Sequence, residues 1–232
     1  MLAIKGFQKN TFLDWDGMIA SILFLPGCNF RCPYCHAAPL VARPHELPSV
    51  PVEEVEQYIE TNRQWIDGVV ISGGEATLQP ELPALIDRLR AIGMAIKLFT
   101  NGTNPQMLGD LLAGGKLAAI SMDIKGPLDD RYSRAAGVPV DLDAVRESIG
   151  LVMNAGIPYE FRTTVCPAVL APEDVADTAR GIQGAKLFIL QQFRPVGCLD
   201  AQYENVKPYS DNELDAMAEL ARPFVQTCVV QK

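Results

Sequence analysis

The sequence contains no long apolar run and no excess of positive charge. No stretch reaches the roughly 18 consecutive apolar residues of a membrane helix, and the opening residues, MLAIKGFQKN, lack the apolar core of a signal peptide. Only 20 Lys and Arg residues stand against 28 Asp and Glu residues, for a formal net charge of -8. Because nucleic-acid binding needs a basic face, we expect a cytoplasmic protein that binds neither nucleic acid nor membranes.

Histidine is scarce, with two residues, but there are six cysteines. In the cytoplasm, cysteines are more often thiols or metal ligands than disulfides. Three cysteines are isolated in sequence and are predicted to be small buried side chains: Cys166, Cys198 and Cys228.

The other three cysteines, Cys28, Cys32 and Cys35, share one loop with C-x3-C-x2-C spacing, just after an apolar run. They cannot pair without leaving one over, but all three can bind one soft metal centre. On a [4Fe-4S] cluster they would leave one iron open to a small molecule. The alternative is a structural zinc site with His36 as fourth ligand, although simultaneous ligation by adjacent Cys35 and His36 is awkward.

Short apolar runs alternate with helical patterns along the chain. Strands are predicted at 19–25, 69–71, 94–99, 117–122, 157–165 and 185–190, with helices between most of them, a last helix from Ser210 and a final strand within 224–230. Residues 1–18 are expected to form an arm or hairpin, and four prolines to keep 37–51 irregular.

This alternation predicts an α/β fold of parallel strands joined by right-handed crossovers. Six β-α units suit a partial (β/α)6 barrel, with short N-terminal and C-terminal extensions, better than a complete eight-fold barrel. The chain length of 232 residues fits a single domain, 1–232, with its functional core at about 17–195.

Polar residues and glycines follow the C-terminal ends of the predicted strands. In parallel α/β folds these ends lie on one face, where ligands bind. Two glycines after a strand let the backbone approach a ligand, and Asp-x-Lys offers an acceptor for ribose hydroxyls and a cation for a carboxylate. Arg162, on the fifth strand, either faces inward or pairs at the surface. The residues expected at this face are Cys28, Gly73, Gly74, Glu75, Thr100, Asn101, Asp123, Lys125, Thr164 and Gln191.

With these pieces assembled, the chain resembles the radical S-adenosylmethionine (SAM) enzymes, whose signature is the cysteine motif with an aromatic residue, here Tyr34, before the last cysteine. More narrowly, it is similar to the activating enzymes of glycyl radical enzymes, above all those of anaerobic ribonucleoside-triphosphate reductase. The stretches that carry this resemblance are GFQKNTFLDWDG, FLPGCNFRCPYCHAAPLV, SGGEATLQPEL, TNGTNP, DIKGP and QQFRP.

The resemblance implies a [4Fe-4S] cluster held by Cys28, Cys32 and Cys35, with SAM on its open iron. It implies contacts from Gly73, Gly74 and Glu75 to the methionine amino group of SAM, from Lys125 to the carboxylate and from Asp123 to the ribose. Tyr34 would lie near the adenine, and Thr100, Asn101, Thr164 and Gln191 would belong to the same site. The implied protein substrate is a glycyl radical enzyme in an anaerobic cell, and the implied electron donor is flavodoxin or ferredoxin.

The sequence departs from the family pattern at three places. Ala76 replaces a proline after Gly-Gly-Glu, and Phe99 stands where pyruvate formate-lyase activases have an acidic residue. Gln191-Gln192-Phe193 stands where those activases have a histidine. The resemblance therefore does not extend to the monovalent-cation site, because of Phe99, or to the histidine contact to ribose, and whether a cation binds near SAM stays open. No cysteine lies between Cys35 and Gly73, which predicts a single cluster.

Three other functions compete with reductase activation. One is another activase, of the pyruvate formate-lyase type. Another is a radical SAM enzyme acting on a small molecule, such as 7-carboxy-7-deazaguanine synthase, which predicts a closed pocket; an activase predicts an open mouth that admits a protein loop. The third is a non-catalytic electron carrier or zinc-stabilised interaction domain.

Overall fold

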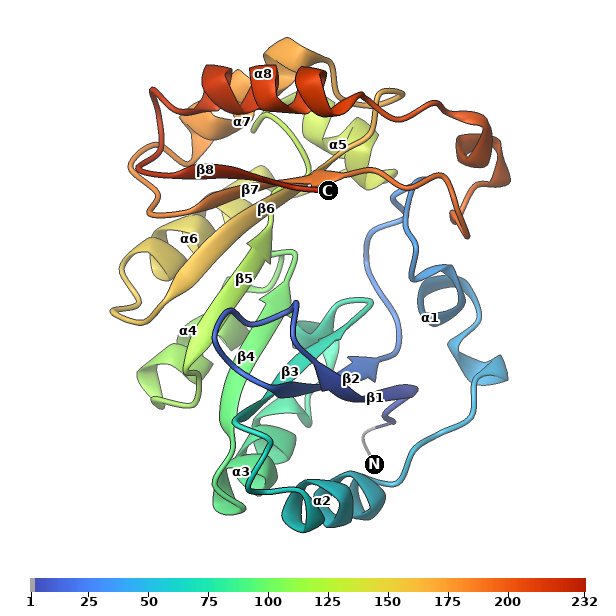
Figure 1. Ribbon diagram of the computed structural model, residues 1–232, viewed down its shortest axis with the longest axis vertical. Helices are drawn as coiled ribbons and strands as arrows, with labels where there is room; N and C mark the ends of the chain where they lie inside the picture. Colours follow the sequence, from blue (N-terminus) through green and yellow to red (C-terminus); the bar gives the residue numbers. More distant parts are fainter. Residues whose placement is uncertain (1–2) are drawn as a thin grey trace.

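The computed structural model describes residues 3–232 and contains one eight-stranded sheet whose strands lie side by side in chain order. The first strand is antiparallel to the second, and every later neighbour pair is parallel (Figure 1). The strands are β1 (Gly6–Thr11), β2 (Ala20–Leu25), β3 (Gly68–Gly73), β4 (Ala95–Thr100), β5 (Ala119–Asp123), β6 (Tyr159–Val165), β7 (Phe188–Gln192) and β8 (Cys228–Gln231).

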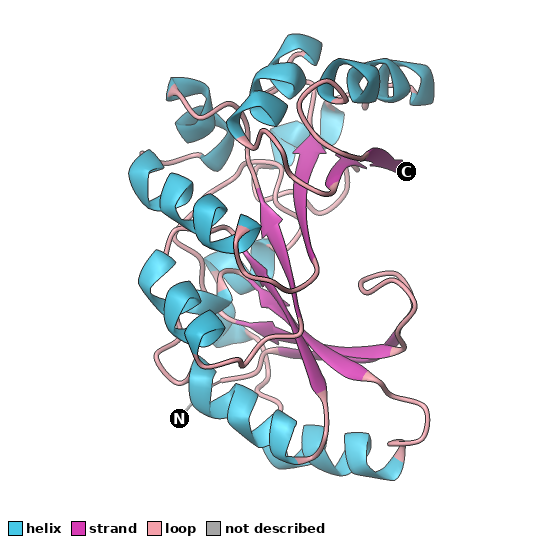
Figure 2. Ribbon diagram, turned by 90° about the vertical axis from the view of Figure 1, so that its left-hand side faces the viewer, coloured by secondary structure: helices cyan, strands magenta, loops and turns pink. Residues whose placement is uncertain are grey.

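Helices connect the parallel strands and gather on one side of the curved sheet (Figure 2). The α-helices are α1 (Ala38–Ala42), α2 (Val52–Thr61), α3 (Leu82–Ala91), α4 (Pro105–Ala113), α5 (Asp130–Ala136), α6 (Leu142–Met153), α7 (Pro172–Gly181) and α8 (Asp211–Ala221). Short 3-10 turns lie at Pro44–Glu46, Ala76–Leu78 and Ala201–Asn205. Among residues 3–232, no helix is long and apolar enough to cross a membrane.

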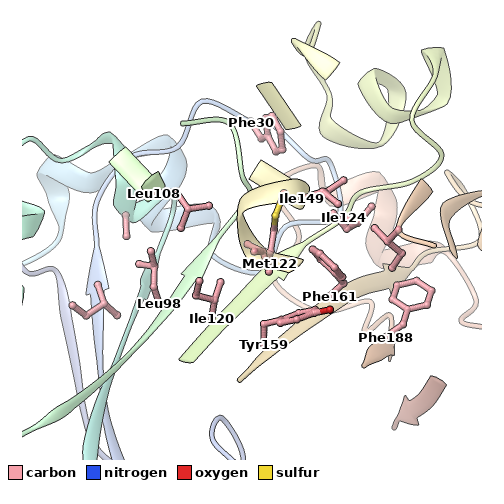
Figure 3. Packing of buried hydrophobic residues seen from close by; sticks show 14 of the residues in the cluster. Phe30, Leu98, Leu108, Ile120, Met122, Ile124, Ile149, Tyr159, Phe161 and Phe188 are labelled. Carbon is pink, nitrogen blue, oxygen red and sulfur yellow. The ribbon is translucent and has the colours of Figure 1, made fainter. Parts of the chain in front are cut away.

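The two faces of the sheet differ in polarity, which is clearest along β6. Tyr159, Phe161, Thr163 and Val165 are buried, whereas the residues between them are partly exposed. Because side chains alternate across a strand, the buried set faces the helices. There Phe161 joins Ile120 and Met122 of β5 in the main apolar core (Figure 3). Glu160, Arg162 and Thr164 therefore lie on the opposite, concave face, where a small second apolar cluster forms around Ile22 and Val70.

The predicted α/β fold and its open sheet are confirmed. All six predicted strands of the repeat are present, shifted by at most three residues at their ends, and the final strand is shortened to β8. The N-terminal arm forms a hairpin with β2 rather than within residues 1–18.

Two helices depart from the prediction. Residues 37–51 are not wholly irregular, because Pro39 occupies the first turn of α1, a position that needs no backbone N–H. Helix α5 was missed because it is only seven residues long; it begins where the Asp129 side chain accepts a bond from Arg131 N and ends at Gly137 in the left-handed conformation.

Because one face of the sheet is buried against the helices, core residues on that face should contribute most to stability. Phe161→Ala should lower the free energy of unfolding of the apoprotein by about 3–5 kcal/mol, because it leaves a cavity between sheet and helices. Urea denaturation measures this value. The matched control is Phe12→Ala, since the Phe12 side chain is 69% exposed and its removal should change stability by less than about 0.5 kcal/mol. Equal losses in both variants would contradict the assignment of the core to the helical side.

Candidate functional site

A cavity of about 220 Å³ opens at the C-terminal ends of the parallel strands. All three motif cysteines line it, together with Tyr34, Gly73, Gly74, Glu75, Thr100, Asn101, Asp123, Lys125 and Thr164. These residues come from the ends of β2 to β6 and from the loops that follow them. The structure thus brings together every residue predicted for the site except Gln191.

Gln191 lies beside this cavity rather than in it. Its Nε2 donates to Gln231 Oε1 at 3.0 Å, and it lines an adjoining cavity of about 410 Å³. Thr164 and His36 line both cavities. Gln191 is therefore placed next to, but not within, the set of predicted cofactor contacts.

The cysteine loop is held from two sides. Gly27 N donates to Leu40 O in α1, and Arg31 N donates to Ala136 O at the end of α5. Gly137 permits this second approach: its φ is +71°, and a Cβ there would lie 2.1 Å from Arg31 O. The two helices that the sequence did not predict thus both fix the loop that carries the cysteines.

Gly73 and Gly74 dock directly against the start of that loop. A Cβ at Gly73 would lie 2.1 Å from Leu25 O, and one at Gly74 would lie 1.9 Å from Gly27 O. Gly74 N and Glu75 N donate to these same two carbonyls, at 3.0 and 2.8 Å. Close packing against β2 and the cysteine loop therefore excludes a side chain at either position, whether or not a ligand also approaches.

The Glu75 carboxylate is buried, with the residue 1% exposed. Its Oε1 accepts from Thr77 N, Thr77 Oγ1 and Thr100 Oγ1 at 3.0, 2.5 and 2.8 Å, and its Oε2 accepts from Asn101 N at 2.6 Å. Burial raises the pKa of Glu75, and these four bonds oppose that rise. The carboxylate joins the end of β3 to the end of β4.

Lys125 is the cation of the cavity. Its Nζ donates to Asp123 Oδ2 at 3.0 Å. Burial disfavours the charged ammonium, but the negative charge of Asp123 is the largest opposing effect, and the pKa of Lys125 lies well above its usual value. Lys125 therefore stays charged at neutral pH and retains further N–H donors for an anionic ligand.

Burial also raises the pKa of the Cys28 thiol and brings that of Cys32 to about 11, with Lys125 opposing both shifts. In the metal-free chain both are protonated at neutral pH, so a metal centre must displace these protons as it binds.

The donor set fits an iron–sulfur cluster and a polar cofactor. The Tyr34 hydroxyl is buried and has no hydrogen-bond partner among the described residues. A buried hydroxyl without a partner is costly, and this one belongs to a residue that lines the cavity. The three cysteines surround the same space, while Lys125 and the glycine turn supply a cation and exposed main chain.

A zinc site fits less well. Among residues 3–232, no three His, Cys, Asp or Glu side chains gather so as to hold a single metal ion. His36 Nε2 lies 2.6 Å from Arg194 O, and because a carbonyl only accepts, this nitrogen carries the proton. His36 thus ties the cysteine loop to the segment after β7, a role that the sequence did not reveal.

Several cavity residues were not predicted: Phe30, His36, Ala37, Val41, Ser72 and Phe99. Ser72 and Phe99 belong to the ends of β3 and β4, so the strand-end rule could have included them. Ala37 and Val41 belong to α1 or its start, which the proline-rich sequence concealed.

The structure is an open, mostly parallel α/β barrel, and three cysteines and a cation lie at the C-terminal ends of its strands. These features define the class of enzymes that use a metal cluster as a cofactor. The radical SAM superfamily model matches residues 22–180, more than half of the chain. The chain belongs to the radical SAM superfamily, whose members use a [4Fe-4S] cluster and SAM.

Similar proteins add detail. A Methanocaldococcus jannaschii protein, provisionally named a glycyl-radical enzyme activating enzyme, is 28% identical over 98% of this chain and 95% of its own length. The 7-carboxy-7-deazaguanine synthase of Neisseria meningitidis is 35% identical over 44% of this chain and 45% of its own. A solved domain of a pyruvate-formate lyase-activating enzyme from Bacteroides vulgatus shares the fold, with a TM-score of 0.57 and 16% identity over 72% of this chain and 99% of that one.

The close contact at Gly74 makes a prediction that needs no partner protein. Gly74→Ala should displace the cysteine loop, because the new Cβ would lie 1.9 Å from Gly27 O. We expect less iron bound after anaerobic reconstitution, measured by iron and sulfide analysis. Gly150→Ala in α6 is the control, since no heavy atom lies within 4 Å of its added Cβ; this change should leave iron content unaltered and stabilise the helix by about 0.5–1 kcal/mol. Full iron content in Gly74→Ala would refute the packing argument.

Proposed function

We propose that this protein is an activating enzyme that generates a glycyl radical on a partner protein. The near-full-length similarity to a relative provisionally named as such an activase supports this function. The resemblance of the sequence motifs makes anaerobic ribonucleoside-triphosphate reductase the first partner to test. We further propose that residues 1–232 act as one domain in the cytoplasm, with flavodoxin or ferredoxin as the electron donor.

The observation that carries the proposal is the continuation of the cofactor cavity into a groove. Beyond Thr164 and His36, the adjoining cavity runs between Leu13, in the β1–β2 connection, and Gln231 and Lys232 at the end of the chain. Leu13 is 79% exposed, and Phe12 beside it is also exposed. An exposed apolar side chain, Leu13, at the edge of a cavity lined mostly by polar residues suits contact with a segment of another protein.

Each cavity residue has a role in this function. Cys28, Cys32 and Cys35 would hold the cluster, and Lys125 would bind the carboxylate of SAM while Asp123 accepts from its ribose. The main chain of Gly73 and Gly74 would contact the SAM amino group, and Glu75 would keep that turn in place. When bound, the reduced cluster and SAM supply a radical able to remove a hydrogen atom from a glycine α-carbon. The surrounding walls position the reacting groups and exclude water.

A third cavity, on the concave face, offers a contact for the substrate segment. It measures about 190 Å³ and is lined by Arg162 together with Leu13, Asp14, Lys97 and Glu160, among others. Arg162 stacks over Phe99 at 4.8 Å, but its buried Nε has no partner among the described residues. Glu160 already pairs with Lys97 at 2.9 Å. We assign this guanidinium to an acceptor on the substrate, such as a main-chain carbonyl.

Action on a small molecule is the second candidate, because of the partial similarity to a 7-carboxy-7-deazaguanine synthase. Anaerobic incubation with SAM and dithionite tests both candidates, and absence of 5′-deoxyadenosine would exclude both. Electron-spin resonance after incubation with candidate reductases separates them. A glycyl-radical doublet supports activation. SAM cleavage with no doublet on any reductase excludes these partners, and the absence of a doublet on enzymes of the pyruvate formate-lyase type as well favours the small-molecule function.

The ligand assignment predicts the behaviour of Cys32→Ala. This variant should fold, because it removes only a small side chain, but should not assemble a four-iron cluster with two cysteines left. Circular dichroism measures the fold, and iron analysis with absorption spectroscopy measures the cluster. Four irons and continued SAM cleavage in Cys32→Ala would overturn the assignment.

The unpartnered guanidinium predicts a substrate-specific defect. Arg162→Met should retain 5′-deoxyadenosine formation without a partner but lose about tenfold or more of its radical yield on the partner, since a charge-assisted hydrogen bond contributes about 1.5–3 kcal/mol. Arg180→Met is the matched control, because Arg180 also stacks on a phenylalanine at 4.8 Å but against Phe224, away from the groove. Parental yield in Arg162→Met would remove Arg162 from substrate recognition.

A further inference from the structure

The Asn101 carboxamide uses all of its hydrogen-bonding capacity within the protein. Its Oδ1 accepts from Thr103 N at 3.0 Å and from Thr103 Oγ1 at 2.7 Å. Its Nδ2 donates to Asn29 Oδ1 at 2.9 Å and to Cys28 Sγ at 3.9 Å. A side-chain amide has two N–H donors and two acceptor lone pairs, so no group remains for a cofactor.

The same contacts fix which way the amide points. Thr103 N is only a donor, so the atom facing it must be the oxygen of Asn101. The nitrogen of Asn101 is then the atom that faces Cys28 and Asn29. A reversed amide would set an N–H against the N–H of Thr103 and an oxygen against the cysteine sulfur.

Asn101 is also immobilised at both ends. Its backbone N donates to the buried Glu75 carboxylate at 2.6 Å, and Asn29 Nδ2 donates to Thr103 Oγ1 at 2.8 Å, which closes a ring of three polar side chains. The residue is 5% exposed. Its N–H therefore reaches Cys28 from a rigid position that does not depend on a bound cofactor.

Cys28 differs from the other two cysteines of the motif in the hydrogen bonds that its sulfur accepts. Its sulfur accepts from Phe30 N at 3.3 Å as well as from Asn101. Within residues 3–232, no hydrogen bond reaches the sulfur of Cys32 or Cys35. The amide donors are thus concentrated on one corner of the cysteine triangle.

We propose that Asn101 is a positioning residue that holds Cys28 and raises the reduction potential of the cluster, and that it is not a contact of SAM. Hydrogen bonds to cysteine sulfur set cluster potentials. A donor stabilises the reduced cluster more than the oxidised one, because reduction adds negative charge that the sulfur ligands share. This inference rests on superfamily membership and not on the proposed partner.

Asn101→Ala and Asn101→Asp test the proposal. The first removes the donor, and the second places a carboxylate oxygen where the donor was, so we expect the midpoint potential to fall in Ala and to fall further in Asp. A redox titration followed by electron-spin resonance measures the potential of the reconstituted cluster. Equilibrium binding of SAM to the oxidised cluster should give the parental Kd in the Ala variant.

Two further variants keep the test decisive. If the Asn101 variants fail to hold four irons, Thr103→Val serves instead. It removes one anchor of the amide but keeps the Asn101 donor, and it should lower the midpoint potential by a smaller amount.

Asn154→Ala is the matched control, because its Nδ2 donates to Gly150 O on the surface of α6, and neither the midpoint potential nor SAM binding should change. An unchanged potential with weakened SAM binding in Asn101→Ala would make Asn101 a SAM ligand and overturn the proposal. None of these measurements involves a partner protein.

Discussion

The candidate site depends on the buried carboxylate of Glu75. An unpaired carboxylate in this position would cost several kcal/mol, and the four donors that offset this cost come from two separate segments of the chain. Thr77 belongs to the turn after β3, whereas Thr100 and Asn101 mark the end of β4. The carboxylate is satisfied only when these ends are in register. The cavity is therefore assembled by the fold, and cofactor binding energy need not organise it.

The glycines before Glu75 meet a second constraint. A glycine pair after a strand is ordinarily interpreted as space for a ligand. Here Gly73 and Gly74 are also required by contact with Leu25 and Gly27. The turn is thus set by the cysteine loop on one side and by the Glu75 bonds on the other. Replacement of the family's proline by Ala76 changes neither set of contacts, because Ala76 is buried in the following 3-10 turn and takes part in none of them.

The sequence was sufficient to predict the fold and most of the candidate site, because both follow from the periodic alternation of strands and helices. Apolar runs marked β2 to β7, and the rule that parallel strands end on one face gathered residues as distant as Cys28 and Thr164. Side-chain pairing could not be predicted in this way. Nothing local shows that Glu75 binds Thr100, that His36 reaches Arg194, or that Gln191 turns to Gln231. Such pairs depend on register between strands far apart in sequence. The short helices α1 and α5 were hidden for another reason, since one or two turns give too little periodicity to recognise.

The concave face shows why Phe99 matters. Lys97 and Arg162 both lie over its ring, with Nζ at 5.2 Å and Cζ at 4.8 Å from the centroid. The resemblance drawn from the sequence implies an acidic residue at this position in pyruvate formate-lyase activases. A carboxylate between these two cations would pair with both of them and occupy some of the guanidinium donors. Phenylalanine attracts the cations through its ring face but accepts no strong hydrogen bond, and Glu160 is occupied by Lys97. Phe99 thus stacks on Arg162 without pairing with its Nε, which is what the proposed recognition of a substrate acceptor requires.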